Sequence, residues 1–243
     1  MKAMILDVDG TLWDTTGVVA EAWMQAASEL MIPLDTPITA DRLKQEFGKP
    51  MDEIAANLFP TLSESQRALV MESCCEYEEF YLENAREPLL FDGVKETILT
   101  LSQNYAVCIV SNCQKGYIEL FLKKTGLENA ITDFECFGNT GLSKGENIRL
   151  LMERAQITDA VYVGDTKGDA DACTFAGIPL FLQNTDSVLP LIMLTKSRVF
   201  QNYWNIPFKK VSEHCPLRYF SSSPDNPDMH ALSQTDAHMY PLL

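Results

Sequence analysis

The sequence predicts an α/β protein whose core is a Rossmann-like parallel sheet, with a bundle of α-helices inserted near the N-terminus. Two patterns predict this fold. Between residues 18 and 86, apolar residues recur at three- and four-residue spacing, as they do along buried faces of helices. After Asp92 and Gly93, short β-branched runs alternate with helical patterns, which is typical of parallel strands joined by helices. We therefore expect residues 1–16 and 87–182 to form the sheet domain and residues 17–86 to form the helical insert.

The N-terminal part begins with a buried strand, predicted at 3–9, that ends in acidic residues. Gly10 and Thr11 then turn the chain toward the helical insert, which we expect to be helical throughout. The insert contains three apolar stripes, and we expect nearly all of their residues to be buried. The stripes are Val19, Ala22, Trp23, Ala26 and Leu30; Leu43, Phe47, Met51, Ile54 and Leu58; and Leu69, Tyr77, Phe80 and Tyr81.

Helices and strands alternate through the second part of the chain. The predicted elements are helix 94–101, strand 106–110, helix 116–124, strand 131–137, helix 144–154, strand 160–163, helix 169–176 and strand 179–182. In sheets of this kind ligands bind beyond the carboxyl ends of the strands, so the residues at those ends are candidates for a site. They are Asp7, Asp9, Ser111, Asn112, Gly164 and Asp165.

Composition excludes several classes of protein. The formal net charge of -15 argues against a nucleic-acid binder, because a phosphate backbone would be repelled. No run of about 18 apolar residues is present, so we expect no membrane span, and the N-terminus does not resemble a signal peptide. The seven cysteines form no C-x-x-C pair, which favours reduced thiols and a cytoplasmic location.

Histidine is absent from the patterned region. His214, His230 and His238 all lie near the C-terminus. A Ser-His-Asp triad, an H-E-x-x-H zinc site or a phosphohistidine would therefore have no histidine in the core. The chemistry must come from Asp, Lys, Ser or Thr.

Acidic residues follow two of the predicted strands, as Asp7-Val8-Asp9 and within Gly164–Asp169. Carboxylates gathered this closely repel one another unless a cation joins them, and oxygen ligands suit Mg²⁺. Ser111 and Lys144 offer a hydrogen-bond donor and a positive charge to a phosphate. The joint occurrence of these groups at strand ends predicts a magnesium-assisted phosphate site.

With these residues in view, the chain resembles the haloacid dehalogenase-like (HAD) hydrolase superfamily, in its phosphoglycolate-phosphatase-like branch. Its motifs are present as D-V-D-G-T at 7–11, V-S-N at 110–112, Lys144, and G-D-T-K-G-D at 164–169. The resemblance covers about residues 1–182, and the helical insert matches the family's cap domain.

The resemblance implies a phosphatase mechanism for these residues. Asp7 would attack phosphorus to form an aspartyl-phosphate, and Asp9 would protonate the leaving oxygen and later activate water. Mg²⁺ would be held by Asp7, the backbone carbonyl of Val8, and Asp165. The further residues implied are Asp9 as part of the metal site, Asp169 as a ligand or as a partner of one, Ser111, Asn112 and Lys144 on the phosphoryl oxygens, and Lys49 of the cap on the leaving group.

Within the superfamily several activities compete. Dehalogenases do not use an acid two residues after the nucleophile, so Asp9 favours phosphoryl chemistry. The expected substrate is a small phosphorylated metabolite, with phosphoglycolate as the family-level example, and the expected assembly is a monomer or homodimer. A sugar phosphomutase would share all the motifs, and a catalytically impaired protein with an incomplete core is a third alternative.

The segment 183–243 departs from the family, and we expect it to be irregular. Ser221–Pro224 and Pro227 predict disorder there. In a shifted reading frame, Leu182–Val188 can encode A-E-Y-G-F-G and Val199–Ile206 can encode F-S-E-L-L-E-Y, both of them family-like runs. We therefore hypothesise a single-base frameshift near residues 180–182, which would remove a closing helix while sparing every motif. Codons unable to encode those runs would refute the hypothesis.

Overall fold

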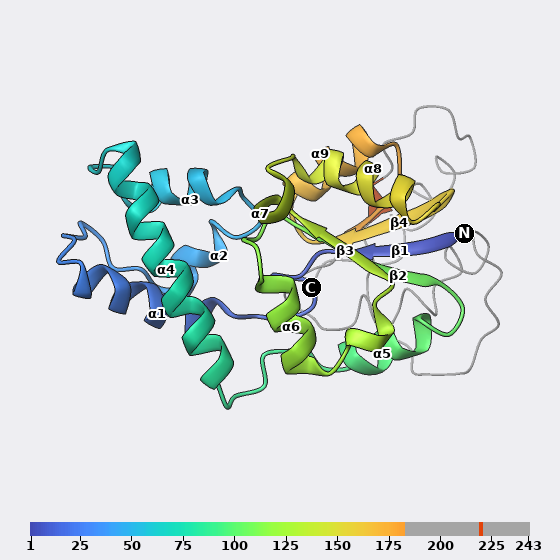
Figure 1. The fold of residues 1–243 in the computed structure, drawn as a ribbon, viewed down its shortest axis with the longest axis horizontal. Coiled ribbons are helices and arrows are strands. Elements are labelled where there is room, and N and C mark those ends of the chain that lie inside the picture. Colours follow the sequence, from blue (N-terminus) through green and yellow to red (C-terminus); the bar gives the residue numbers. More distant parts are fainter. Residues whose placement is uncertain (183–218, 221–243) are drawn as a thin grey trace, which may run out of the picture.

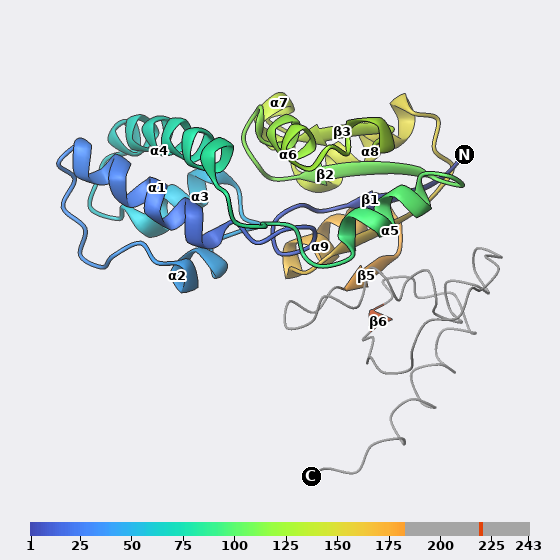
Figure 2. The same ribbon diagram turned by 90° about the horizontal axis from the view of Figure 1, so that it is seen from below.

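A parallel sheet lies at the centre of the fold, with helices on both of its faces (Figures 1 and 2). The computed structural model describes residues 1–182 and 219–220. Within them the strand order is β3-β2-β1-β4-β5-β6, with β6 antiparallel to β5 and the other pairs parallel. The strands are β1 (Lys2–Leu6), β2 (Ala106–Ser111), β3 (Asp133–Cys136), β4 (Asp159–Gly164), β5 (Leu180–Leu182) and β6 (Tyr219–Phe220).

The central strands are buried on both faces, as their apolar sequences predict. In β1, Met4 and Leu6 belong to one hydrophobic cluster and Ala3 and Ile5 to another. The first cluster packs against α5 (Val94–Leu101) and α6 (Tyr117–Thr125), and the second against α8 (Lys144–Arg154) and α9 (Lys167–Ala176). Two short elements, η1 (Glu128–Ala130) and α7 (Phe137–Thr140), flank β3. The predicted α/β class is confirmed.

Four helices form a layer beyond the carboxyl ends of the central strands (Figure 1). They are α1 (Thr16–Glu29), α2 (Ala40–Lys44), α3 (Met51–Leu58) and α4 (Glu64–Asn84). The expected helical bundle is confirmed, although segments outside helices separate its members, so the insert is not helical throughout. The breaks have local causes, because Thr39 and Ser63 cap the helices that follow them with their side chains.

The third apolar stripe is not the buried face of α4. Leu69 is 65% exposed and Phe80 is 63% exposed. The buried row instead consists of Val70, Met71, Cys74, Glu78 and Leu82. The expectation fails because a carboxylate occupies one position of this row and hides it from a search for apolar spacing. Leu30 is also exposed, since it lies just beyond the end of α1.

Several remaining expectations concern single segments. None of the helices described is both long enough and apolar enough to cross a membrane. Six cysteines of the described part are free thiols, and Cys215 lies outside that part. The expectation of an irregular segment at 183–243 also falls outside the described residues. The exception is Tyr219–Phe220, which pairs with β5 as a strand that the sequence did not predict.

Candidate active site

The turn after β1 fixes the positions of the first two acids. The strand ends at Leu6, and the Asp7 amide donates to the Val163 carbonyl at 2.9 Å. The Val8 carbonyl accepts the amides of Thr11, Leu12 and Trp13 at 3.3, 2.8 and 3.3 Å. This oxygen already accepts three amides of the turn, which disfavours its expected use as a metal ligand.

The Asp7 carboxylate lies in the interior, with 1% of the residue exposed. Lys144 Nζ lies 3.1 Å from its Oδ2. Apart from this ion pair, its two oxygens have no hydrogen-bond partner among the described residues. Burial raises the pKa of Asp7 to about 8, with Lys144 opposing the shift and Asp169 and Asp165 adding to it. A buried carboxylate whose oxygens accept no hydrogen bond is suited to bind a ligand.

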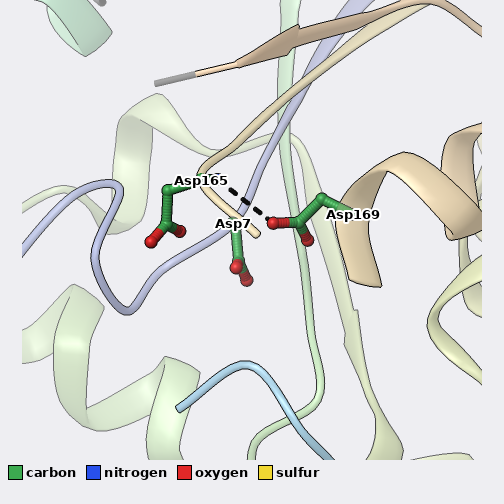
Figure 3. A group of neighbouring side chains, drawn as sticks. All are labelled: Asp7, Asp165 and Asp169. Atoms are coloured by element: carbon green, nitrogen blue, oxygen red, sulfur yellow. Dashed lines mark hydrogen bonds between the residues drawn. The ribbon is translucent and has the colours of Figure 1, made fainter. Parts of the chain in front are cut away.

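Asp7, Asp165 and Asp169 bring their carboxylates together (Figure 3). One oxygen from each lies within 4.8 Å of the others. Burial is the main cause that raises the pKa of Asp165 to about 6, followed by the charge of Asp169. Such repulsion between oxygen donors is relieved by a divalent cation, and an all-oxygen set fits Mg²⁺ or Ca²⁺.

Asp169 is engaged by hydrogen bonds on both oxygens. Its Oδ2 accepts from the amides of Asp165 and Thr166, at 3.1 and 2.8 Å, and from Thr166 Oγ1 at 2.7 Å. Its Oδ1 accepts from Lys144 Nζ at 2.6 Å. Although burial alone would raise the pKa of Asp169, Lys144 and Thr166 lower it. We expected Asp169 to be either a metal ligand or a partner of one. These contacts favour the second role, in which Asp169 orients Asp165 and Lys144.

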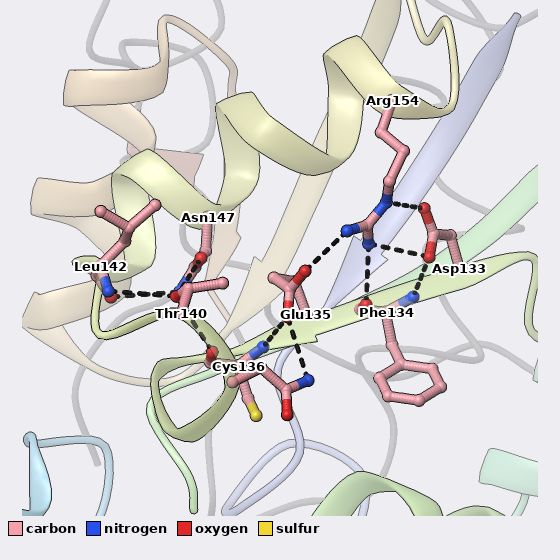
Figure 4. A network of polar contacts seen from close by, with 9 residues as sticks. Asp133, Phe134, Glu135, Cys136, Thr140, Leu142, Asn147 and Arg154 are labelled. Atoms are coloured by element: carbon pink, nitrogen blue, oxygen red, sulfur yellow. Dashed lines mark hydrogen bonds and ion pairs between the residues drawn. The ribbon is translucent and has the colours of Figure 1, made fainter. Parts of the chain in front are cut away.

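Lys144 is the first residue of α8 and is 4% exposed. Burial disfavours its ammonium form, but Asp169 and Asp7 outweigh burial and raise its pKa. The chain before it is held by a polar network (Figure 4). There Thr140 Oγ1 donates to Asn147 Oδ1 at 2.8 Å, and Asn147 Nδ2 donates to the Leu142 carbonyl at 3.1 Å.

Arg154, the last residue of α8, belongs to the same network (Figure 4). Its guanidinium donates to both Asp133 oxygens at 2.9 Å and to Glu135 Oε2 at 2.7 Å. Because Asp133 and Glu135 lie in β3, this contact ties α8 to the sheet edge. The network thus fixes the helix whose first residue is Lys144.

Asp9 is oriented through a single oxygen. Its Oδ1 accepts from Tyr117 OH at 2.5 Å, Trp13 Nε1 at 3.1 Å and Thr15 Oγ1 at 3.3 Å. Burial raises the pKa of Asp9 to about 6, and these three donors limit the rise. Asp9 does not belong to the group of three acids described above, so its carboxylate is separate from the candidate metal site.

One cavity joins the sheet to the helical layer, and most of the expected residues line it. Its walls include Asp7, Asp9, Ser111, Asn112 and Lys49. The room inside is about 30 Å³, enough for about two water molecules. Asn112 Nδ2 donates to the Gly48 carbonyl at 2.7 Å, and Lys49 Nζ pairs with Glu46 Oε2 at 2.8 Å. Asn112, one of the expected phosphate contacts, and Lys49, the expected leaving-group contact, are therefore both engaged with protein groups here.

The cavity also contains residues that the sequence did not single out for the site, namely Trp23, Glu78, Gln114 and Tyr117. Trp23 was expected in the core only, and the structure places it at the cavity wall as well. The one available signal for Glu78 was its place, four residues after Cys74 and four before Leu82, on the buried row of α4. No spacing argument could have found Gln114, because it lies in a loop.

Gly10 is required by the turn. Its φ is +76°, and an added Cβ would lie 2.9 Å from Cγ of Asp165. We expect Gly10→Ala to lower the free energy of unfolding by about 1–3 kcal/mol and to displace Asp165. Gly17→Ala is the matched control, because its Cβ would meet nothing within 4 Å. Equal stability of the two variants in urea denaturation would contradict this account of the turn.

The fold defines a class of protein, an α/β domain with a Rossmann-like parallel sheet and a helical insert beyond the carboxyl ends of its strands. The chain belongs to the haloacid dehalogenase-like hydrolase family, whose sequence profile matches residues 4–182. The match ends at the last residue of β5. No curated protein sequence matches the chain.

Solved structures share this fold. A haloacid dehalogenase-like hydrolase from Bacteroides fragilis is 20% identical with a TM-score of 0.66, over 75% of this chain and 87% of that one. A predicted phosphatase from Clostridium acetobutylicum is 16% identical with a TM-score of 0.64, over 76% and 85%. CbbY from Rhodobacter sphaeroides, in complex with phosphate, is 16% identical with a TM-score of 0.64, over 75% and 87%.

Proposed function

We propose that the protein is a Mg²⁺-dependent phosphatase that hydrolyses a small phosphorylated metabolite through an aspartyl-phosphate on Asp7. One observation carries the proposal. Asp7 is buried, its oxygens accept no hydrogen bond within the described residues, and Lys144 lies 3.1 Å away. A carboxylate attacks phosphorus only if its lone pairs are available, and a nearby ammonium offsets charge on the transferring group.

The acidic cluster fits the metal that this chemistry requires. Asp7 and Asp165 would hold the ion with one oxygen each, while Asp169 keeps Asp165 and Lys144 in place. When bound, Mg²⁺ neutralises charge between the carboxylate and the phosphoryl oxygens, which otherwise repel each other. The donor set consists of oxygen only, as Mg²⁺ prefers.

Asp9 is the proposed acid and base. Three donors hold its Oδ1, so the carboxyl group has a fixed orientation toward the cavity that it shares with Asp7. It would give a proton to the oxygen of the departing alcohol and then remove one from the water that attacks the aspartyl-phosphate. Ser111, 4% exposed at the end of β2, would donate to a phosphoryl oxygen.

We assign residues 17–86 the role of a cap that opens for substrate. The room of about 30 Å³ is too small for a phosphate ester, so the helical layer must move away before one can enter. The hydrogen bond from Asn112 to Gly48 would then break and free the Asn112 amide for the phosphoryl group. A cytoplasmic location and a monomeric or dimeric state remain part of the proposal.

Phosphate release from a panel of esters with Mg²⁺, by the protein and by Asp7→Asn, tests this function. We expect release that depends on both the metal and Asp7. Release that persists in Asp7→Asn would refute the mechanism. Isomerisation of a hexose phosphate without net release would favour the phosphomutase alternative, and inactivity with poor solubility would favour the impaired protein.

Binding of Mg²⁺ should be visible without turnover. The ion relieves repulsion among Asp7, Asp165 and Asp169, so saturating Mg²⁺ should raise the melting temperature by roughly 5 °C. Asp165→Asn should abolish most of this shift. Asp171→Asn, in which a side chain that is 72% exposed is changed, should retain it. Equal shifts in the two variants, measured by calorimetry, would remove Asp165 from the metal site.

A further inference from the structure

Glu78 is a buried acid on the cap side of the active-site cavity. It lies on α4 and is 3% exposed. Trp23 Nε1 donates to its Oε2 at 2.8 Å, and Gln114 Nε2 donates to its Oε1 at 2.9 Å. Trp23 comes from α1, whereas Gln114 comes from the loop after β2. The carboxylate is therefore fixed from both the cap and the sheet domain.

Burial of a carboxylate destabilises the fold, whereas an apolar residue at position 78 would suffice for packing of the helix. Both partners of Glu78 are N–H donors, so it acts as an acceptor on both oxygens, and each oxygen retains a second lone pair. Burial is the main cause that raises the pKa of Glu78 to about 7, and the charge of Asp9 adds to it. Glu78 and Asp9 both line this one cavity.

Lys49, the cationic cap residue that lines the cavity, does not balance this charge. Lys49 Nζ lies 2.8 Å from Glu46 Oε2, which also accepts from Asn57 Nδ2 at 2.7 Å. Lys49 and Glu46 thus neutralise each other at the wall of the cavity. Above about pH 7, where Glu78 is mostly ionised, the cap side of the cavity is left with acceptor oxygens and a net negative charge.

We infer that Glu78 is a specificity-determining residue, which selects leaving groups that carry hydroxyl groups and rejects leaving groups that carry a carboxylate. The inference rests on the proposed function. Hydroxyl groups of a departing polyol would donate to the free lone pairs of Glu78, whereas a carboxylate would face a fixed like charge. The substrate class is therefore a polyol monophosphate. A phosphorylated hydroxy acid such as phosphoglycolate is disfavoured.

Two esters that differ in one group test this inference. Glycerol 3-phosphate and 3-phosphoglycerate differ by a hydroxymethyl group in place of a carboxylate. At pH 8, where Glu78 is mostly ionised, we expect kcat/KM for the protein to favour the glycerol ester by about tenfold or more, and Glu78→Gln to reduce this preference about tenfold. The ratio of the two values is unaffected by a loss of folded protein, because both esters are measured on one preparation.

Two further variants sharpen the test. Glu76→Gln makes the same charge change on an exposed position of α4 and should leave the ratio unchanged. Glu46→Gln frees the Lys49 ammonium from its charged partner and should shift the ratio severalfold toward phosphoglycerate. This second variant tests the charge argument even where Glu78→Gln fails to fold.

The outcomes distinguish a failure of the role inferred for Glu78 from a failure of the proposed phosphatase function. An unchanged ratio in both Glu78→Gln and Glu46→Gln, in a protein whose phosphate release depends on Asp7, would overturn the role of Glu78 and leave the proposed function intact. A preference of the unaltered protein for phosphoglycerate would overturn it as well. Absence of release from every ester, or release that survives Asp7→Asn, would remove the proposed function itself.

Discussion

Replacement of Asp7 by asparagine is expected to lower kcat for phosphate release by roughly 10⁴-fold or more, the scale seen when a catalytic nucleophile is removed. Asparagine preserves the shape of the side chain, and the backbone hydrogen bond from residue 7 to Val163 does not involve the carboxylate. The fold should therefore persist, and the loss should lie in the chemical step. Steady-state phosphate release, with circular dichroism of both proteins, makes the measurement.

Asp159→Asn provides the matched control for Asp7→Asn. Asp159 begins β4, at the opposite end of that strand from Gly164, and its side chain is 40% exposed. Within the described part of the chain its side chain makes a 3.9 Å ion pair with Lys2, and exposed pairs of this kind contribute little, so we expect activity within about twofold of the unaltered protein. A comparable loss in both variants would show that Asp7→Asn acts through general destabilisation.

Lys144→Met should have the largest effect on stability. The ammonium lies 2.6 Å from Asp169 and 3.1 Å from Asp7, and its loss leaves both buried carboxylates without their cation. Removal of one partner of a buried ion pair costs about 3–5 kcal/mol. We expect a loss of this size in the free energy of unfolding, measured by urea denaturation in EDTA at pH 8.

The stability lost in Lys144→Met should be smaller at lower pH. The folded-state pKa of Asp7 is already raised to about 8 from an ordinary 3.8, so the folded protein binds the additional proton. For an acid shifted in this direction, stability falls as the pH rises from about 4 to 8. Without Lys144 the pKa of Asp169 is no longer lowered by the ammonium, so a second carboxyl group takes up a proton and the dependence should steepen. Lys144→Met should then approach the unaltered protein near pH 5.

Two variants control for Lys144→Met. Lys167→Met removes a lysine that is 91% exposed and should change stability by less than about 0.5 kcal/mol. The double variant Lys144→Met/Asp169→Asn should be more stable than Lys144→Met alone, because one uncompensated charge has gone. If the second substitution lowers the free energy of unfolding by as much again, the ion pair is not the source of the effect.

Much of the sheet could be predicted from sequence because its signal is local. Apolar runs such as Ala3–Leu6 and Ala106–Val110 lie in strands, and the alternation with helices indicated parallel pairing. The location of the acids was also predictable, since parallel strands bring their carboxyl ends to one edge. Asp7, Asp165 and Asp169 meet there, although Asp7 lies far from the other two in the chain.

The features that the sequence did not predict have a different physical origin. The use of the Val8 carbonyl depends on the backbone path of the turn, which the residue types do not state. Glu78 depends on contacts with Trp23 and Gln114 across two domains, and these are set by packing alone. The exposed Leu69 and Phe80 show that apolar spacing cannot identify a buried face when that face includes a charged residue.

The anchoring of Asp9 has a consequence for the order of events in a catalytic cycle. Trp13, Thr15 and Tyr117 hold this residue, and none of them lies within α1, α2, α3 or α4. In the proposed cycle, cap opening would break the contacts of Gln114 and Asn112 with the cap and leave Asp9 aligned. The alcohol could then depart, and water could enter by the same route, while Asp7 still carried the phosphoryl group. Release of the first product and hydrolysis can thus follow each other without reassembly of the site.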